Sequence, residues 1–275
     1  APTLLAKQNL LRESINEDNV FVVGNSVIDA LFFTLDKLKK TTPCLDYTPS
    51  ERKFILITGH RRENFGDNFL NICNSIKELA IKYGDMDFVY PLHLNPNICE
   101  PAKKILSGIK NVYLIEPLEY ESFVYLMSKA YIILTDSGGI QEEAPSFGKP
   151  VLVMRNNTER PEAVEAGTVR LVGTTGIVDE VCKLVENVDE YNKFKNLKNP
   201  YGDGKTSNKI LRSEASNRFE KGLDPNRTYM AMDRACNLLQ EFANGNVNTG
   251  IVVYDKTDKT NKVIDITVEN INNIL

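Results

Sequence analysis

Short apolar runs alternate with longer amphipathic stretches between residues 54 and 195. The runs are rich in Ile, Val, Leu and Phe, which is typical of strands buried on both faces of a parallel sheet. We predict strands at 54–57, 88–92, 112–115, 131–135, 151–154 and 168–173. The stretches between them have apolar residues at helical spacing, which predicts helices at 68–83, 119–129, 140–144, 177–186 and 190–195. This alternation predicts an α/β fold with a doubly wound parallel sheet.

The first 52 residues have a different pattern. Leucines at helical spacing predict a helix at 4–13, and the apolar run at 20–23 predicts a short strand. Ser26 is expected to cap a helix that ends near residue 39. Residues 40–52 are polar and contain two prolines, which is typical of a connector. A chain that opens inside such a pattern, without a polar lead, is expected to begin in mid-domain.

The stretch 136–162, DSGGIQEEAPSFGKPVLVMRNNTERPE, carries the strongest signal for a ligand site. A predicted buried strand leads into Ser137-Gly138-Gly139, where two residues lack Cβ, and a helix follows. Free N–H groups at such a turn favour an anion. Glu143 is expected to project back over the turn and to accept hydrogen bonds from ribose hydroxyls. Arg155 and Arg160 follow the next strand, at the edge where such sheets bind ligands.

Alternatives remain open for several of these residues. The glycine turn alone fits an ordinary tight loop between a strand and a helix, and only its combination with Glu143 and Arg160 favours a phosphate or nucleotide site. His60 and Arg61 follow the strand at 54–57 and can donate charge-assisted hydrogen bonds to a pyrophosphate, although a solvated basic loop has the same residues. From the pattern alone, His93 fits a hydrogen-bonded structural histidine and Phe123 a core residue.

Composition narrows the function classes. The net charge is −4, so no basic surface for nucleic acid is expected. The five cysteines and two histidines are scattered, which argues against a zinc site and a disulfide framework. No apolar run is long enough to cross a membrane and no leader pattern opens the chain. We therefore expect a cytoplasmic protein that binds neither nucleic acid nor a membrane.

The motifs DSGGIQEEAPSFGKPVLVMRNNTERPEAVEAGTVRLVG, GHRRENFG, YPLHLNPN and NPYGDGK resemble the carboxyl-terminal half of the non-hydrolysing UDP-N-acetylglucosamine 2-epimerases. The resemblance runs from about residue 1 to about residue 210. It implies the Rossmann-like carboxyl-terminal domain of a GT-B fold, at 41–211. It also implies that residues 1–40 are the end of a truncated amino-terminal domain and its hinge. UDP-N-acetylglucosamine and UDP are the implied ligands, no cofactor or metal is implied, and a homodimer is an expected assembly.

The resemblance also assigns roles to residues. His60 is implied as a catalytic, substrate-contacting residue near the diphosphate, and Phe123 as the aromatic wall against the uracil, beside backbone groups near Leu118. The remaining UDP-binding residues that it implies are Ser137, Gly138, Gly139, Glu143 and Arg160. Arg61 and His93 are implied at a second, allosteric UDP-sugar site between the domains.

The implied reaction inverts C2 of UDP-N-acetylglucosamine to give UDP-N-acetylmannosamine by eliminating UDP and adding it back. In this family the carboxylates that help to remove the C2 proton lie on the amino-terminal domain. These 275 residues do not contain that domain, so we expect a UDP-binding half with little activity alone. A glycosyltransferase of the same architecture is a related alternative, and the HRREN and SGGIQEE patterns favour the epimerase.

From about residue 212 the pattern changes. The motif RSEASNRFEKGLDPN resembles the phenylalanyl-tRNA synthetase beta subunit, and we interpret 212–275 as a fragment of that kind with a small α+β structure. Asp224 and Pro225 are expected to start a helix, and 250–254 and 263–268 are expected strands. The chain would then be a chimera. A non-catalytic binding or interaction module, with this tail docked on RNA or a partner chain, is the alternative function.

Overall fold

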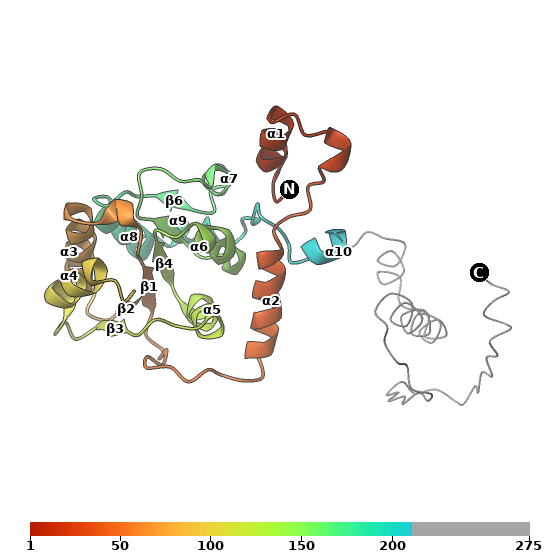
Figure 1. The fold of residues 1–275 in the computed structure, drawn as a ribbon. Coiled ribbons are helices and arrows are strands. Elements are labelled where there is room, and N and C mark those ends of the chain that lie inside the picture. The colour runs from red at the N-terminus through yellow and green to blue at the C-terminus, as the bar shows by residue number, and fades with distance from the viewer. Residues whose placement is uncertain (211–275) are drawn as a thin grey trace, which may run out of the picture. The chain divides into compact units, whose positions relative to one another are not determined.

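A computed structural model describes residues 1–210, in which helices surround a six-stranded sheet (Figure 1). The strands are β1 (Phe54–Thr58), β2 (Asp87–Pro91), β3 (Val112–Ile115), β4 (Ile132–Thr135), β5 (Val151–Val153) and β6 (Arg170–Leu171). They lie in the order β3-β2-β1-β4-β5-β6, and all five pairings are parallel. The predicted doubly wound parallel sheet is therefore confirmed.

The strand order changes direction between β1 and β4. The chain runs outward from β1 through β2 to β3, and then returns to the other side of β1 to begin β4. The register places Thr58 beside Thr135, so β1 and β4 end side by side. In sheets of this kind, the loops after two such neighbouring strands diverge and leave a crevice for ligands. The loops that follow these two strands carry most of the site residues predicted above.

The helices are α1 (Leu4–Arg12), α2 (Ser26–Leu38), α3 (Asp67–Lys82), α4 (Pro96–Leu106), α5 (Tyr120–Lys129), α6 (Gly138–Glu143), α7 (Pro161–Glu165), α8 (Ile177–Glu186), α9 (Val188–Asn192) and α10 (Thr206–Ile210). Short 3₁₀ turns lie at Glu17–Asn19, Arg62–Asn64 and Ala144–Phe147. None of the helices within residues 1–210 is both long and apolar enough to cross a membrane.

Several expected boundaries are wrong. Residues 20–23 form no strand: Val20 is buried but Phe21 is 69% exposed, so the run has no second face to bury. The cap of α2 is Asn25, whose side chain accepts from Val27 N at 3.1 Å, and Ser26 is the first helical residue. The helix after the glycine turn begins at Gly138, not at residue 140.

Helix α4 was not predicted at all. Its sequence contains Pro101, which interrupts the backbone hydrogen-bond ladder of a helix and argues against one. The helix forms because Asn95 caps it, with its side chain accepting from Asn97 N at 3.0 Å, and because Pro96 suits its first turn. Buried Ile98 also anchors it to the core. Capping and tertiary packing together outweigh the interior proline.

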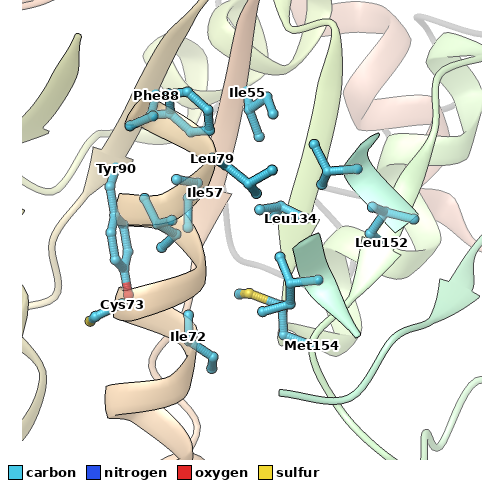
Figure 2. Packing of buried hydrophobic residues seen from close by; sticks show 14 of the residues in the cluster. Ile55, Ile57, Ile72, Cys73, Leu79, Phe88, Tyr90, Leu134, Leu152 and Met154 are labelled. Atoms are coloured by element: carbon cyan, nitrogen blue, oxygen red, sulfur yellow. The ribbon is translucent and has the colours of Figure 1, made fainter. Parts of the chain in front are cut away.

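Two hydrophobic clusters cover the two faces of the sheet. Helices α3, α4 and α8 pack on one face, against Ile57, Phe88 and Leu134, and Figure 2 shows this cluster. Helices α2 and α5 pack on the other face, against Leu56 and Ile133. Side chains alternate between the faces along each strand, and each fully buried one contributes about 1.5–3 kcal/mol. This core fixes the strand ends from which the site loops start.

The expected segment boundaries at residues 40 and 211 remain predictions. Helix α2, which lies before the first boundary, packs against α5 and α6 within the unit of residues 1–210. The tail at 212–275, with its expected helix and strands, lies outside the described residues.

Candidate functional site

A buried carboxylate organises the loop after β1. Asp136, the first residue after β4, is 1% exposed. It accepts hydrogen bonds from His60 N at 3.0 Å, from Arg61 N at 2.9 Å and from the Asn64 side chain at 3.1 Å. Nδ1 of His60 lies 3.9 Å from the same carboxylate. Because a buried charge must be compensated by donors, this loop is held against the end of β4.

The glycine turn forms a corner beside two guanidinium groups. Ser137 N donates to the Thr135 hydroxyl at 3.0 Å, which fixes the chain as it leaves β4. A Cβ built on Gly138 would lie 3.4 Å from Nη2 of Arg61 and 3.9 Å from Nη2 of Arg160. A Cβ on Gly139 would have Ser137 Oγ at 3.9 Å as its nearest neighbour. Gly138 is therefore buried beside two positive charges, whereas Gly139 is exposed.

The two arginines after β5 have different surroundings. Arg155 is only 6% exposed, and its guanidinium donates to the carboxylates of Glu63 and Glu159. Arg160 is about one-third exposed and donates from Nε to Glu142. The contacts of Arg155 are used within the protein, so it holds loops together, whereas Arg160 keeps part of its guanidinium at the corner.

Glu143 lies in a desolvated position. It is 7% exposed, and its Oε2 accepts from the Tyr120 hydroxyl at 3.3 Å. Burial raises the pKa of Glu143 to about 7, the hydrogen bond from Tyr120 opposes this rise, and the charge of Glu142 adds to it. Arg160 pairs with Glu142, whereas the adjacent Glu143 lies beside Tyr120.

A pocket of about 210 Å³ adjoins the glycine turn. Its lining residues come from the ends of β1, β2, β3 and β4 and from α5 and α6: Thr58, Gly59, His60, Pro91, His93, Pro117, Leu118, Phe123, Ser137 and Ile140. His60, Phe123 and Ser137, which were predicted for one UDP site, thus share one pocket. Phe123 also contacts the core cluster on the α5 side of the sheet, so it serves both as core and as pocket wall.

The two residues expected at a second, allosteric site lie close to the groups described above, and their allosteric role stays a prediction. His93 lines this same pocket, with its ring stacked on that of His60 at a centroid distance of 5.7 Å and an interplanar angle of 16°. Arg61 lies over the glycine turn, with Nη1 3.7 Å from Glu159. Within the described residues, both therefore adjoin the groups expected at the main site.

Sequence reasoning assigned no role to Asp136, Glu142 or Tyr120. Asp136 carried a usable signal, because an acid directly after a buried strand faces the site edge of the sheet. Glu142 and Tyr120 carried none that separates them from neighbouring solvent-facing residues. Within residues 1–210, no group of three or more His, Cys, Asp and Glu side chains could hold a metal ion. The donors gathered here, two guanidiniums and free amides, suit an anion such as phosphate.

Comparison with known proteins decides the family. The family model described as UDP-N-acetylglucosamine 2-epimerase matches residues 1–214. This chain belongs to the UDP-N-acetylglucosamine 2-epimerase family. It is 53% identical over 222 residues to the UDP-N-acetylglucosamine 2-epimerase of Campylobacter jejuni, covering 76% of this chain and 58% of that protein. The Escherichia coli K12 epimerase is 50% identical over 228 residues, covering 80% of this chain and 61% of that one.

Solved structures of epimerases agree with this assignment. The Neisseria meningitidis UDP-GlcNAc 2-epimerase bound to UDP-GlcNAc matches with a TM-score of 0.73 at 55% identity, covering 78% of this chain and 60% of that one. The Methanocaldococcus jannaschii epimerase, in complex with UDP-GlcNAc and UDP, matches with a TM-score of 0.63 at 38% identity, covering 77% and 59%. The chain thus spans about 60% of the length of these epimerases, and it has their Rossmann-like α/β fold.

Proposed function

We propose that this chain supplies the UDP-binding part of an epimerase that converts UDP-N-acetylglucosamine to UDP-N-acetylmannosamine by UDP elimination and re-addition. The observation that carries this proposal is the glycine corner, which has guanidinium groups of Arg61 and Arg160 beside Gly138 and an apolar pocket next to it. Family relatives with UDP-GlcNAc or UDP in their structures support the choice of ligand.

The diphosphate and the uracil bind to different parts of the site, the glycine turn and the apolar pocket. The diphosphate accepts hydrogen bonds from the amides of Gly138 and Gly139 and from Nη2 of Arg160. The bonds are charge-assisted and therefore stronger than bonds between neutral groups. The uracil lies against Phe123 and Leu118, since a flat base needs an apolar wall and a few backbone partners. Ser137 lines the pocket between these two regions. Glu143 accepts hydrogen bonds from the ribose hydroxyls, and its side chain turns away from Tyr120 to do so.

His60 is the candidate for direct action on the substrate. Its side chain is 47% exposed at the pocket, and its backbone is fixed by Asp136. When UDP leaves, negative charge develops on the diphosphate oxygen, and groups placed in advance near that oxygen stabilise the transition state. His60, as a hydrogen-bond donor, and the guanidinium of Arg160 are the groups that we assign to this task.

Several further assignments are part of the proposal and await their own tests. Little turnover by these 275 residues alone stays a prediction, which rests on the family resemblance that implies the catalytic carboxylates on an amino-terminal domain. A coupled epimerase assay with robust turnover would contradict this. The allosteric role of Arg61 and His93, a homodimer and a cytoplasmic location also stay predictions. So does the likeness of residues 212–275 to a phenylalanyl-tRNA synthetase beta subunit.

Calorimetric titration with UDP tests the proposal. We expect a dissociation constant of about 1 mM or tighter for the chain. Arg160→Ala should weaken it by about 10- to 100-fold, the value of one charge-assisted hydrogen bond. Arg12→Ala is the matched control, because Arg12 is exposed on α1, which lends no side chain to the described pocket. Equal, negligible heats for the wild-type chain and for Arg160→Ala would overturn the proposal.

A further inference from the structure

Glu142 connects two segments that lie far apart in the sequence. It is 8% exposed, and both of its carboxylate oxygens have a partner. Oε1 accepts from Nε of Arg160, and Oε2 accepts from the side-chain amide of Asn25 at 2.5 Å. Its backbone carbonyl accepts from the Asn199 side chain at 2.7 Å. A buried carboxylate with this many donors has a fixed orientation.

The contacts of Arg160 direct one particular nitrogen towards the glycine turn. Nε donates to Glu142, and Nη1 donates to the backbone carbonyl of Glu159 at 3.1 Å. Nη2 is the nitrogen near Gly138, 3.9 Å from the place where a Cβ would stand. A guanidinium is planar, so fixing Nε and Nη1 fixes the direction of Nη2 as well. Without such restraint, the long side chain loses rotamer freedom each time it binds a ligand.

Asn25 is itself held by the start of α2. Its Oδ1 accepts from Val27 N at 3.1 Å as the helix cap, and its backbone N donates to Tyr201 O at 2.6 Å. This leaves its amide group free to donate to Glu142. The chain of contacts therefore runs from the cap of α2, through one carboxylate, to the guanidinium that faces the glycine corner.

We propose that Glu142 is a positioning residue for Arg160, and that Asn25 positions Glu142, so that the cap of α2 determines how well the site binds a diphosphate. This inference deepens the proposed function and rests on it. Glu142 touches no ligand in this account. Its effect is confined to ligands with phosphate groups, because only these use Nη2 of Arg160.

Exchanging the carboxylate and the amide between Glu142 and Asn25 conserves the net charge and tests the positioning role. Glu142→Gln places an amide group against one of two donors, so one hydrogen bond is lost. Adding Asn25→Asp restores the pattern, because the new carboxylate accepts from the glutamine amide and can still cap α2. The net charge of the double variant equals that of the wild-type chain. Glu165→Gln is the matched single-charge control, since Glu165 is exposed on α7 and has no ion pair within the described residues.

The experiment measures dissociation constants for UDP and for uridine, which lacks phosphates, by calorimetry and by NMR titration of the chain. Glu142→Gln should weaken UDP about tenfold and leave uridine unchanged. The double variant should recover most of the loss, and Glu165→Gln should match the wild-type chain. Asn25→Ser, which keeps a cap but is too short to reach Glu142, should weaken UDP by about threefold.

The binding data distinguish failure of the positioning role from failure of the proposed function. If Arg160→Ala weakens UDP but Glu142→Gln and Asn25→Ser do not, the positioning role is wrong and the proposed function stands. If Glu142→Gln weakens UDP and uridine equally, or if the double variant recovers nothing, Glu142 is only a structural residue. If the wild-type chain does not bind UDP, the proposed function fails and the positioning role fails with it.

Discussion

The two sides of the site are stabilised by different physical effects. Around the glycine turn, charges are paired: Arg155 and Arg160 each donate to carboxylates, and Asp136 accepts three backbone or side-chain donors. On the side of α5, Phe123 is partly buried against the core, and Glu143 of α6 is buried with the Tyr120 hydroxyl as its hydrogen-bond donor. The charge-paired side orients groups for an anion, and the desolvated side offers an apolar wall for a base. Substitutions on the two sides should therefore have distinguishable effects.

The largest expected effect is on the desolvated side, at Glu143. Its pKa in the folded chain is raised to about 7, above its unfolded value near 4.5. The folded state thus binds the extra proton more tightly, so this stabilisation is present below about pH 4.5 and is lost as pH rises through 7. Relative to Glu143→Gln, the wild-type chain should lose about 2–3 kcal/mol of unfolding free energy between about pH 5 and pH 8. Urea denaturation at both pH values measures this difference.

Subtracting the unfolding free energy of Glu143→Gln from that of the wild-type chain cancels the contributions of the other titrating groups. A wild-type minus variant difference that stays constant between the two pH values would show that Glu143 is not desolvated. The two sides of the site would then not differ in desolvation.

The next effect is on the charge-paired side, at Arg155. Arg155→Ala should lower the free energy of unfolding by about 2 kcal/mol, since charge-assisted hydrogen bonds to two glutamates are lost. The bonds from Arg155 hold the pKa of Glu159 at about 2, so this pKa should rise in the variant, as NMR can show. The ratio of UDP to uridine affinity should change by less than about threefold. A larger change would mean that Arg155 contacts the ligand.

Phe123→Ala should affect the base and not the phosphates. Removing an aromatic wall costs about 1–2 kcal/mol of base binding, or about tenfold in affinity. UDP and uridine should weaken by the same factor, whereas Arg160→Ala should weaken UDP alone. Because Phe123 also packs on the core, thermal unfolding should be followed in parallel. Loss of UDP binding with uridine binding retained would contradict the assignment of the base to this wall.

The smallest expected effect is at Tyr120. Its hydroxyl donates to Glu143 at 3.3 Å and holds the pKa of that acid down against burial. Tyr120→Phe should therefore raise the pKa of Glu143 further, because the hydrogen bond that is lost is worth about 1 kcal/mol. The measured quantity is the free energy of unfolding of Tyr120→Phe minus that of the double variant Tyr120→Phe/Glu143→Gln. This difference should keep changing up to a higher pH than the same difference measured with Tyr120 present. No change would show that this contact is absent in solution.

Much of the fold followed from the sequence, because buried parallel strands are continuous apolar runs. The run 131–135 became β4, but the equally apolar run 20–23 did not become a strand. Among residues 1–210 no strand pairs with it, and pairing is a tertiary property that one segment does not encode. The helix α4 was missed for a related reason, since its cap and its burial outweigh Pro101.

The site was predicted in residue types more than in partners. Glu142 and Glu143 are neighbours on a helix, so their side chains point about 100° apart. Which of them faces Arg160 and which faces Tyr120 depends on how α6 is rotated against its neighbours, and this is set by packing. The position of His93 beside His60 likewise depends on β2 and β1 being adjacent in the sheet.

A crystal structure of the chain bound to UDP would show whether the diphosphate lies at the glycine turn. We expect phosphate oxygens within about 3 Å of the Gly138 and Gly139 amides and of Nη2 of Arg160, with the uracil against Phe123 and no contact from Arg155. A diphosphate bound away from the glycine turn, with Nη2 of Arg160 facing solvent, would contradict this expectation.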